Sequence, residues 1–148
     1  AVVEELADFF APQAQAQGVR LRVDLAKGPL RAMLDTPHVK QAVLNLMLNA
    51  VQAMSDPAAA NRELLLRTER RTDADRHPVL ALHVIDTGPG IPPESLERIF
   101  QPYFTTKSGG TGLGLPTARR LVEGHEGRLE VHTEVGRGTD FTAIFPAL

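Results

Sequence analysis

Apolar residues repeat at helical spacing in the first part of the chain, and the pattern changes to alternation directly after it. Between residues 2 and 13 they follow the i, i+3, i+4, i+7 spacing, which predicts a helix that ends near Gly18. From Val19 to Leu25 apolar and charged residues alternate, as in a half-buried strand. A Gly-Pro turn follows, and residues 30–34 are a candidate for a short second strand.

A second, longer helix is predicted from Thr36 to about Met54. Thr36 is the expected N-cap, and Pro37 suits the first helical position. The helix is apolar nearly all round, so we expect it to be buried. Its exceptions are amides that fall within about 80° of arc, namely Gln41, Asn45, Asn49 and Gln52. Such a stripe either faces a ligand or is satisfied by neighbouring backbone or solvent.

The rest of the chain predicts four strands and two helices. The strands are expected at residues 62–70, 79–85, 128–135 and 139–145. A short helix is expected near 93–100, and another from Pro116 to Gly124. Because strands and helices do not alternate strictly, the pattern favours an α+β fold: a two-layer α/β sandwich in which a mixed, mostly antiparallel sheet has helices packed on one face.

Composition narrows the class of protein. The 148 residues suit one domain, and 43% hydrophobic with 23% charged residues is typical of a globular protein. The net charge of −2 argues against a broad nucleic-acid-binding surface, and the absence of cysteine excludes thiol catalysis. No apolar run approaches the roughly 20 residues of a membrane span. The first residue is Ala rather than Met, which indicates a piece of a longer protein.

Candidate chemistry lies in an irregular segment from Asp86 to Gly114, which is long for a compact domain and typical of a binding loop or lid. Asp86 follows an apolar strand and precedes two glycines, so its carboxylate can reach into a pocket; by itself this pattern is only a turn. Further on, several glycines lead into a helix, where backbone N–H groups and the helix N-terminus suit phosphate. The segment lacks the Lys of a P-loop, and Thr117 stands where a dinucleotide fingerprint needs Gly.

Taken in order, five segments resemble the nucleotide-binding boxes of the catalytic domain of two-component sensor histidine kinases. This fold is shared with gyrase, heat-shock ATPase chaperones and mismatch-repair ATPases. QAVLNLMLNAVQAM resembles the N box, DTGPG the G1 box, IFQPYFTTK the F box, GTGLGL the G2 box and GRGTDF the final glycine box. The resemblance covers about residues 36–145. The stretch GLGLPTARRLVEGHEGRLEV is similar to nitrogen-regulator-type sensor kinases.

The resemblance implies a site for ATP or ADP with Mg²⁺. Asn49 would be the metal ligand, with Asn45 supporting the phosphate side one turn earlier. Asp86 would accept from the adenine amino group, and residues 100–111 would form a lid anchored by Phe100 and Phe104. The implied nucleotide-binding set is Asn45, Asn49, Gln52, Asp86, Gly88, Gly90, Ile91, Phe104, Lys107, Gly110, Thr111, Gly112, Leu113, Gly114, Leu115 and Thr139.

Two positions bear on the reaction type. The related ATPases carry a water-activating Glu where this chain has Asn45, which implies slow hydrolysis and transfer of the γ-phosphate to another acceptor. Many sensor kinases carry Lys at the position of Gln52. We predict that Lys107 supplies this charge and acts with Asn45 in catalysis; the alternative is that Lys107 is a solvated charge.

The phosphoacceptor histidine is expected outside this chain. None of the five histidines stands in an acceptor-like context: His38, His77, His83, His125 and His132. We therefore interpret residues 1–18 as a linker helix from the dimerisation domain and 19–148 as the ATP-binding catalytic domain. The partners implied are that dimerisation domain and a cognate response regulator.

The fragment is expected to be cytoplasmic, monomeric, not bound to nucleic acid, and unable to autophosphorylate alone. Three other functions are compatible with parts of this sequence: an ATP-driven clamp of the gyrase or chaperone kind, a serine kinase that acts on an anti-anti-sigma partner, and a degenerate binding module. The Asn at position 45, the F box and the five complete boxes favour the histidine kinase.

Overall fold

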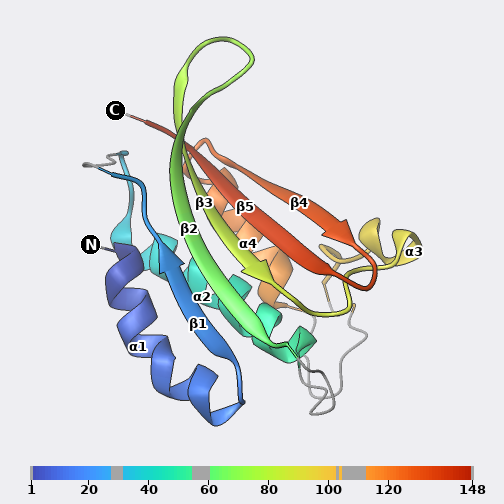
Figure 1. The fold of residues 1–148 in the computed structure, drawn as a ribbon. Coiled ribbons are helices and arrows are strands. Elements are labelled where there is room, and N and C mark those ends of the chain that lie inside the picture. Colours follow the sequence, from blue (N-terminus) through green and yellow to red (C-terminus); the bar gives the residue numbers. More distant parts are fainter. Residues whose placement is uncertain (1, 28–31, 55–60, 103, 105–112, 148) are drawn as a thin grey trace.

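A five-stranded sheet forms one layer of the molecule, and helices cover one of its faces (Figure 1). The computed structural model describes residues 2–27, 32–54, 61–102, 104 and 113–147. In spatial order the strands are β1 (Arg20–Asp24), β2 (Glu63–Thr72), β3 (Pro78–Asp86), β5 (Gly138–Pro146) and β4 (Arg128–Glu134). Strand β1 runs parallel to β2, and all other neighbours are antiparallel. The predicted α+β two-layer sandwich is confirmed.

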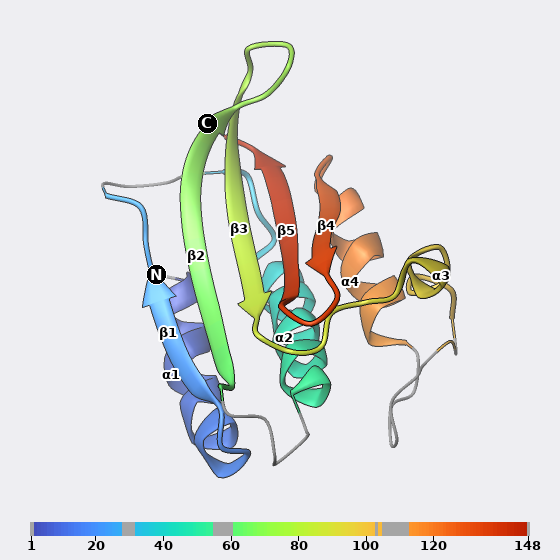
Figure 2. The same cartoon turned by 45° about the vertical axis from the view of Figure 1, so that its right-hand side comes forward.

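Three helices lie side by side on the same face of the sheet (Figures 1 and 2). They are α1 (Val2–Ala16), α2 (Thr36–Ala53) and α4 (Gly114–Glu123). The short helix α3 (Pro93–Leu96) lies at the β4 side of the molecule. Within the described residues, no helix is both long and apolar enough to cross a membrane.

The core lies between the sheet and these helices. Helix α1 buries Val3, Leu6, Phe10 and Ala14, which recur at helical spacing on one side. Helix α2, as its composition predicts, buries residues along most of its length. Its buried side chains are Val39, Ala42, Val43, Leu46, Met47, Ala50 and Val51. The sheet contributes its helix-facing side chains, which are Leu64, Leu66, Leu82, Val84, Phe141, Ala143 and Phe145.

Helix starts differ from prediction by one or two residues. The N-cap of α2 is Asp35, whose side chain accepts from the His38 backbone N–H, so Thr36 is the first helical residue rather than the cap. Asp and Thr both cap well, and here the loop geometry gives the role to Asp35. Helix α4 begins at Gly114, not Pro116. Pro116 still lies in the first turn, where no backbone N–H is needed.

Two predicted segments are shorter than expected. Helix α3 ends at Leu96, and turns continue to Phe100. Residues 32–34 are not a strand, and the remainder of the candidate strand at 30–34 lies outside the described residues.

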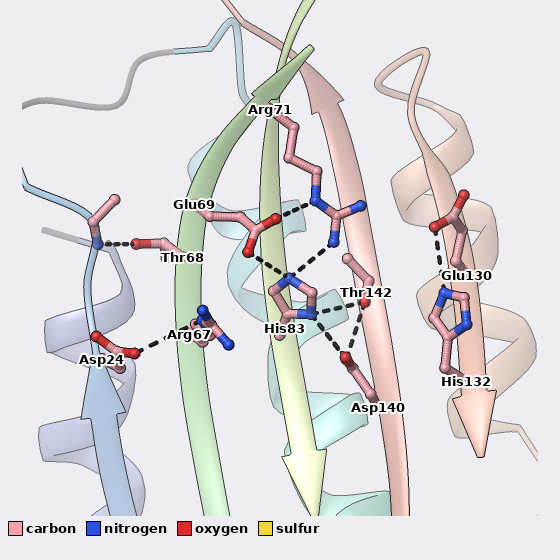
Figure 3. Close-up of polar contacts among 11 residues, drawn as sticks. Asp24, Arg67, Thr68, Glu69, Arg71, His83, Glu130, His132, Asp140 and Thr142 are labelled. Carbon is pink, nitrogen blue, oxygen red and sulfur yellow. Dashed lines mark hydrogen bonds and ion pairs between the residues drawn. The ribbon is translucent and has the colours of Figure 1, made fainter. Parts of the chain in front are cut away.

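The outer face of the sheet, opposite the helices, carries paired charges. Figure 3 shows His83 between β2 and β5. Its Nδ1 lies 2.9 Å from an Asp140 oxygen and 3.0 Å from the Thr142 hydroxyl, and its Nε2 lies 3.4 Å from Glu69. A hydrogen bond from Arg71 lowers the pKa of the Glu69 carboxyl from its ordinary value. This network lies on the opposite face of the sheet from Asp86 and Thr139, because neighbouring residues of a strand point to opposite faces.

Candidate functional site

The first part of the site is the end of β3. Asp86 follows Leu82 and Val84 on the helix-facing side and is only 3% exposed. Its Oδ1 accepts from the Gly88 N–H at 2.9 Å. A Cβ at Gly88 would lie 3.2 Å from the carbonyl oxygen of Ala53. The G1 segment therefore packs directly against the last turn of α2.

The turn between β4 and β5 closes this end of the site. Asp86 pairs with Thr139 in the β3–β5 ladder, so their side chains lie next to each other on one face. Gly138 has φ of +143°, and a Cβ there would overlap the carbonyl oxygen of Asp86. Gly90 has φ of +80°, and its Cβ would lie 2.5 Å from the Glu134 carbonyl oxygen. At these two places the main chains of neighbouring segments lie so close together that only glycine fits.

The second part of the site joins α2 to the start of α4. The Asn45 side chain donates from Nδ2 to the Gly114 carbonyl oxygen at 3.4 Å, and it accepts from Gln41 at 2.9 Å. A Cβ on Gly114 would meet no atom of the described residues within 4 Å. Gly114 begins α4, so the first backbone N–H groups and the positive end of the helix dipole lie close to Asn45.

Helix α2 connects the two parts. Ala53 touches the G1 segment and Asn45 touches α4, and eight residues of helix span about 12 Å. Asn49 lies between them on the same stripe and is half-buried, whereas Gln52 is exposed. The spacing suits an elongated ligand with one end at Asp86 and the other at Gly114.

Some of the remaining predicted residues lie in the described part of the chain, and others do not. Ile91 and Leu115 are half-buried and pack against the core, as does Phe104. Phe100, at the base of the predicted lid, lies under the Arg119 guanidinium at 4.9 Å. Leu113 precedes α4 as its N-cap. Four predicted residues lie outside the described part of the chain, namely Lys107, Gly110, Thr111 and Gly112.

Two threonines of the site were missed by sequence reasoning. Thr87 accepts from the Glu63 N–H and donates to the Asn61 carbonyl oxygen, which joins the end of β3 to the start of β2. Thr133 contacts Ile91, Gly138 and Thr139. In the sequence each is one threonine at the end of a strand, which is an ordinary position for this residue type.

A shallow, open pocket of ≈ 330 Å³ is lined by Asp86 and Thr139 together with Ile85, His132 and Asp140. The last three residues point to the outer face of the sheet by strand alternation. Among the described residues, none of α2 or α4 lines this pocket.

The family described as "Histidine kinase-, DNA gyrase B-, and HSP90-like ATPase" matches residues 34–148. The chain belongs to this family. Among curated relatives of this histidine kinase-type ATPase domain, the sensor histidine kinase ZraS of Salmonella typhimurium is 33% identical over 147 residues, which are 99% of the chain and 30% of ZraS. The signal transduction histidine-protein kinase AtoS of Escherichia coli is 36% identical over 138 residues, covering 89% of the chain and 21% of AtoS.

Solved structures agree with this assignment. The catalytic domain of the histidine kinase ThkA superposes with a TM-score of 0.81 at 28% identity, covering 98% of this chain and 90% of that one. Full-length ShkA in complex with AMPPNP gives 0.82 at 27% identity, with coverage of 99% and 29%. The chain is thus a member of the histidine kinase-type ATPase family with the fold of histidine kinase catalytic domains, as the resemblance implied, and it spans less than a third of ZraS and AtoS.

Proposed function

We propose that this histidine kinase-type domain binds Mg-ATP and donates the γ-phosphate to a histidine on a separate dimerisation domain. The observation that carries the proposal is the placement of Asp86 and Thr139 near the C-terminal end of α2, and of Gly114 beside Asn45 in the middle of that helix. The relatives are named sensor kinases, and the ShkA structure is described as a complex with AMPPNP.

At the base end, Asp86 accepts a hydrogen bond from the adenine amino group. Its burial and its bond from Gly88 hold the carboxylate in one orientation. Gly88 and Gly90 keep the surface beside it free of side chains, and Ile91 adds apolar contact. Thr139 lies beside Asp86 and completes this end.

At the phosphate end, the start of α4 offers the groups that an anion needs. Gly114 and Leu115 supply backbone N–H groups in the first turn of α4, and Leu113 precedes them. Gly110, Thr111, Gly112 and Lys107 are proposed to complete the cradle. The half-buried Asn49 fits Mg²⁺, because an amide oxygen is a hard ligand and Mg²⁺ takes few protein ligands when phosphates and water supply the rest. Held there, the ion would supply positive charge next to the phosphates.

Transfer rather than hydrolysis follows from Asn45. An amide does not take a proton from water at neutral pH, and this one already bonds Gln41 and Gly114. Asn45 therefore fixes the relation of α2 to α4 instead of activating a nucleophile. The γ-phosphate is left for an acceptor histidine, with Asn45 and Lys107 acting by position and charge.

The wider setting is also proposed. The chain is a cytoplasmic, monomeric part of a longer kinase, in which residues 1–18 link to the dimerisation domain and 19–148 bind ATP. A cognate response regulator then receives the phosphate. The described complex of ThkA with the response regulator protein TrrA, at 25% identity and a TM-score of 0.78, supports this partner class.

The proposal is tested by calorimetric titration of ATP and ADP into the chain, with Mg²⁺ and with a chelator. We expect binding by the wild type and a roughly 10- to 100-fold loss of Mg²⁺-dependent affinity in Asn49→Ala. The matched control is Gln13→Ala, which removes an exposed amide from α1 and should bind as the wild type does. Equal Mg²⁺-dependent affinity in Asn49→Ala contradicts the metal role.

The same sample, incubated with γ-labelled ATP, should retain no acid-labile phosphohistidine. Stable label on the chain would contradict an acceptor outside it. Fast release of inorganic phosphate would instead favour a hydrolase.

A further inference from the structure

Thr133, near the end of β4, holds three segments of the base end together. Its hydroxyl accepts from the Ile91 N–H at 2.9 Å, donates to the Gly138 carbonyl oxygen at 3.0 Å, and lies 2.9 Å from the Thr139 hydroxyl. Ile91 directly follows the G1 segment, whereas Gly138 and Thr139 begin β5. One hydroxyl therefore fixes the G1 segment against the β4–β5 turn.

The proton count of this cluster fixes the direction of each bond. A threonine hydroxyl has one proton and two lone pairs. The Gly138 carbonyl oxygen only accepts, so Thr133 gives it its proton. Thr133 must then accept from both Ile91 and Thr139. The single proton of Thr139 is thereby directed at Thr133, and only lone pairs of Thr139 remain for a ligand.

This direction matters because Thr139 stands beside Asp86. The two residues are opposite each other in the β3–β5 ladder, on the helix-facing side. An ionised carboxylate is also an acceptor only. The base end thus presents two neighbouring acceptors, which an exocyclic amino group with its two N–H donors satisfies. A purine with a 6-oxo group places an acceptor there instead.

We propose that Thr133 is a positioning residue that gives the site its preference for a 6-amino over a 6-oxo purine, by holding the Thr139 proton away from the ligand. The inference rests on the proposed nucleotide-binding function. Thr133 does not itself touch the base; it acts through Thr139 and through the position of Ile91.

The test compares ADP with inosine diphosphate, which carries a 6-oxo group, by calorimetric titration of the wild type, Thr133→Val and Thr133→Ser. In Thr133→Val the Thr139 proton is released toward the ligand. We expect ADP affinity to fall by roughly 3- to 10-fold while inosine diphosphate is bound equally well or better. The ratio of ADP affinity to inosine diphosphate affinity therefore decreases. Thr133→Ser keeps the hydroxyl and should restore the wild-type preference.

A purely structural role would weaken both nucleotides by the same factor. An unchanged ratio of the two affinities in Thr133→Val therefore overturns the inference, whether or not overall affinity falls. Thermal melting shows which variants are folded. If Thr133→Val does not fold, Thr133→Cys, whose thiol is a weak hydrogen-bonding group, serves the same comparison. A wild type that binds neither nucleotide contradicts the proposed function itself.

Discussion

At the scale of single residues, the site depends on places where a Cβ has no room. Gly136 and Gly138 stand two positions apart in the β4–β5 turn, both with positive φ, of +85° and +143°. A Cβ on Gly136 would meet no described atom within 4 Å, but a Cβ on Gly138 would overlap the Asp86 carbonyl oxygen. Alanine at position 136 therefore tests backbone strain alone, whereas alanine at position 138 adds a steric clash with Asp86.

We expect Gly136→Ala to lose about 1–2 kcal/mol of unfolding free energy, from backbone strain alone. Gly138→Ala should lose roughly 1–3 kcal/mol more, because β3 and β5 must move apart. It should also weaken ADP binding, since Asp86 moves with β3. Urea unfolding and calorimetric titration measure the two effects. Equal losses in both variants would contradict a steric role for Gly138.

At the scale of elements, α2 is placed by contacts at both of its ends. Asp35 caps its first turn, and the Asp35 backbone N–H donates to Nε2 of His125 at 2.9 Å, just after α4. His125 Nδ1 lies 2.8 Å from the Leu121 carbonyl oxygen, which suits the tautomer with its proton on Nδ1. At the other end, Gly88 packs on Ala53. Helix α2 is thereby held to α4 and to the G1 segment.

The cap of α2 provides a test at this scale. Asp35→Ala should lower the free energy of unfolding by about 1 kcal/mol, because the His38 N–H loses its acceptor. The neighbouring Thr36→Ala should change it by less than about 0.5 kcal/mol, since Thr36 is exposed within the first turn. Thermal and urea unfolding of both variants measure this. A larger loss of unfolding free energy in Thr36→Ala than in Asp35→Ala would instead indicate that Thr36 is the N-cap.

At the scale of the whole molecule, α1 is part of the packed core. Phe10 is 0% exposed within the main core, whereas its neighbour Phe9 is 71% exposed. Lys40 of α2 also pairs with Glu5 of α1, and this contact lowers the pKa of the Glu5 carboxyl. The domain boundary predicted at residue 18 stays a prediction, but the helix before it stabilises the fold.

Neighbouring phenylalanines allow a matched test of this packing. Phe10→Ala should cost about 3–5 kcal/mol of unfolding free energy, because it leaves a cavity between α1 and the core. Phe9→Ala should cost less than about 0.5 kcal/mol. Urea unfolding gives both values. A small effect of Phe10→Ala would indicate that α1 folds apart from the rest of the domain.

The strands around Leu64 and Val84 and the long helix around Leu46 were predicted correctly, because alternation and helical spacing are local properties. Predictions that depended on loop geometry were less exact, as at Asp35 and at the start of α4. Thr133 could not be recognised from the sequence, since its role exists only through partners from two other segments, Ile91 and the start of β5.

The sequence by itself therefore determined the types of element, the burial of α2 and the order of the five glycine- and amide-containing segments, from which the family followed. Only the tertiary structure decided that Asn45 meets Gly114, that Asp86 stands beside Thr139, and that Phe10 is buried in the core. Spacing along the chain fixes which side chains share one face of one element. Which faces meet depends on long-range pairing and packing, and spacing along the chain does not encode this.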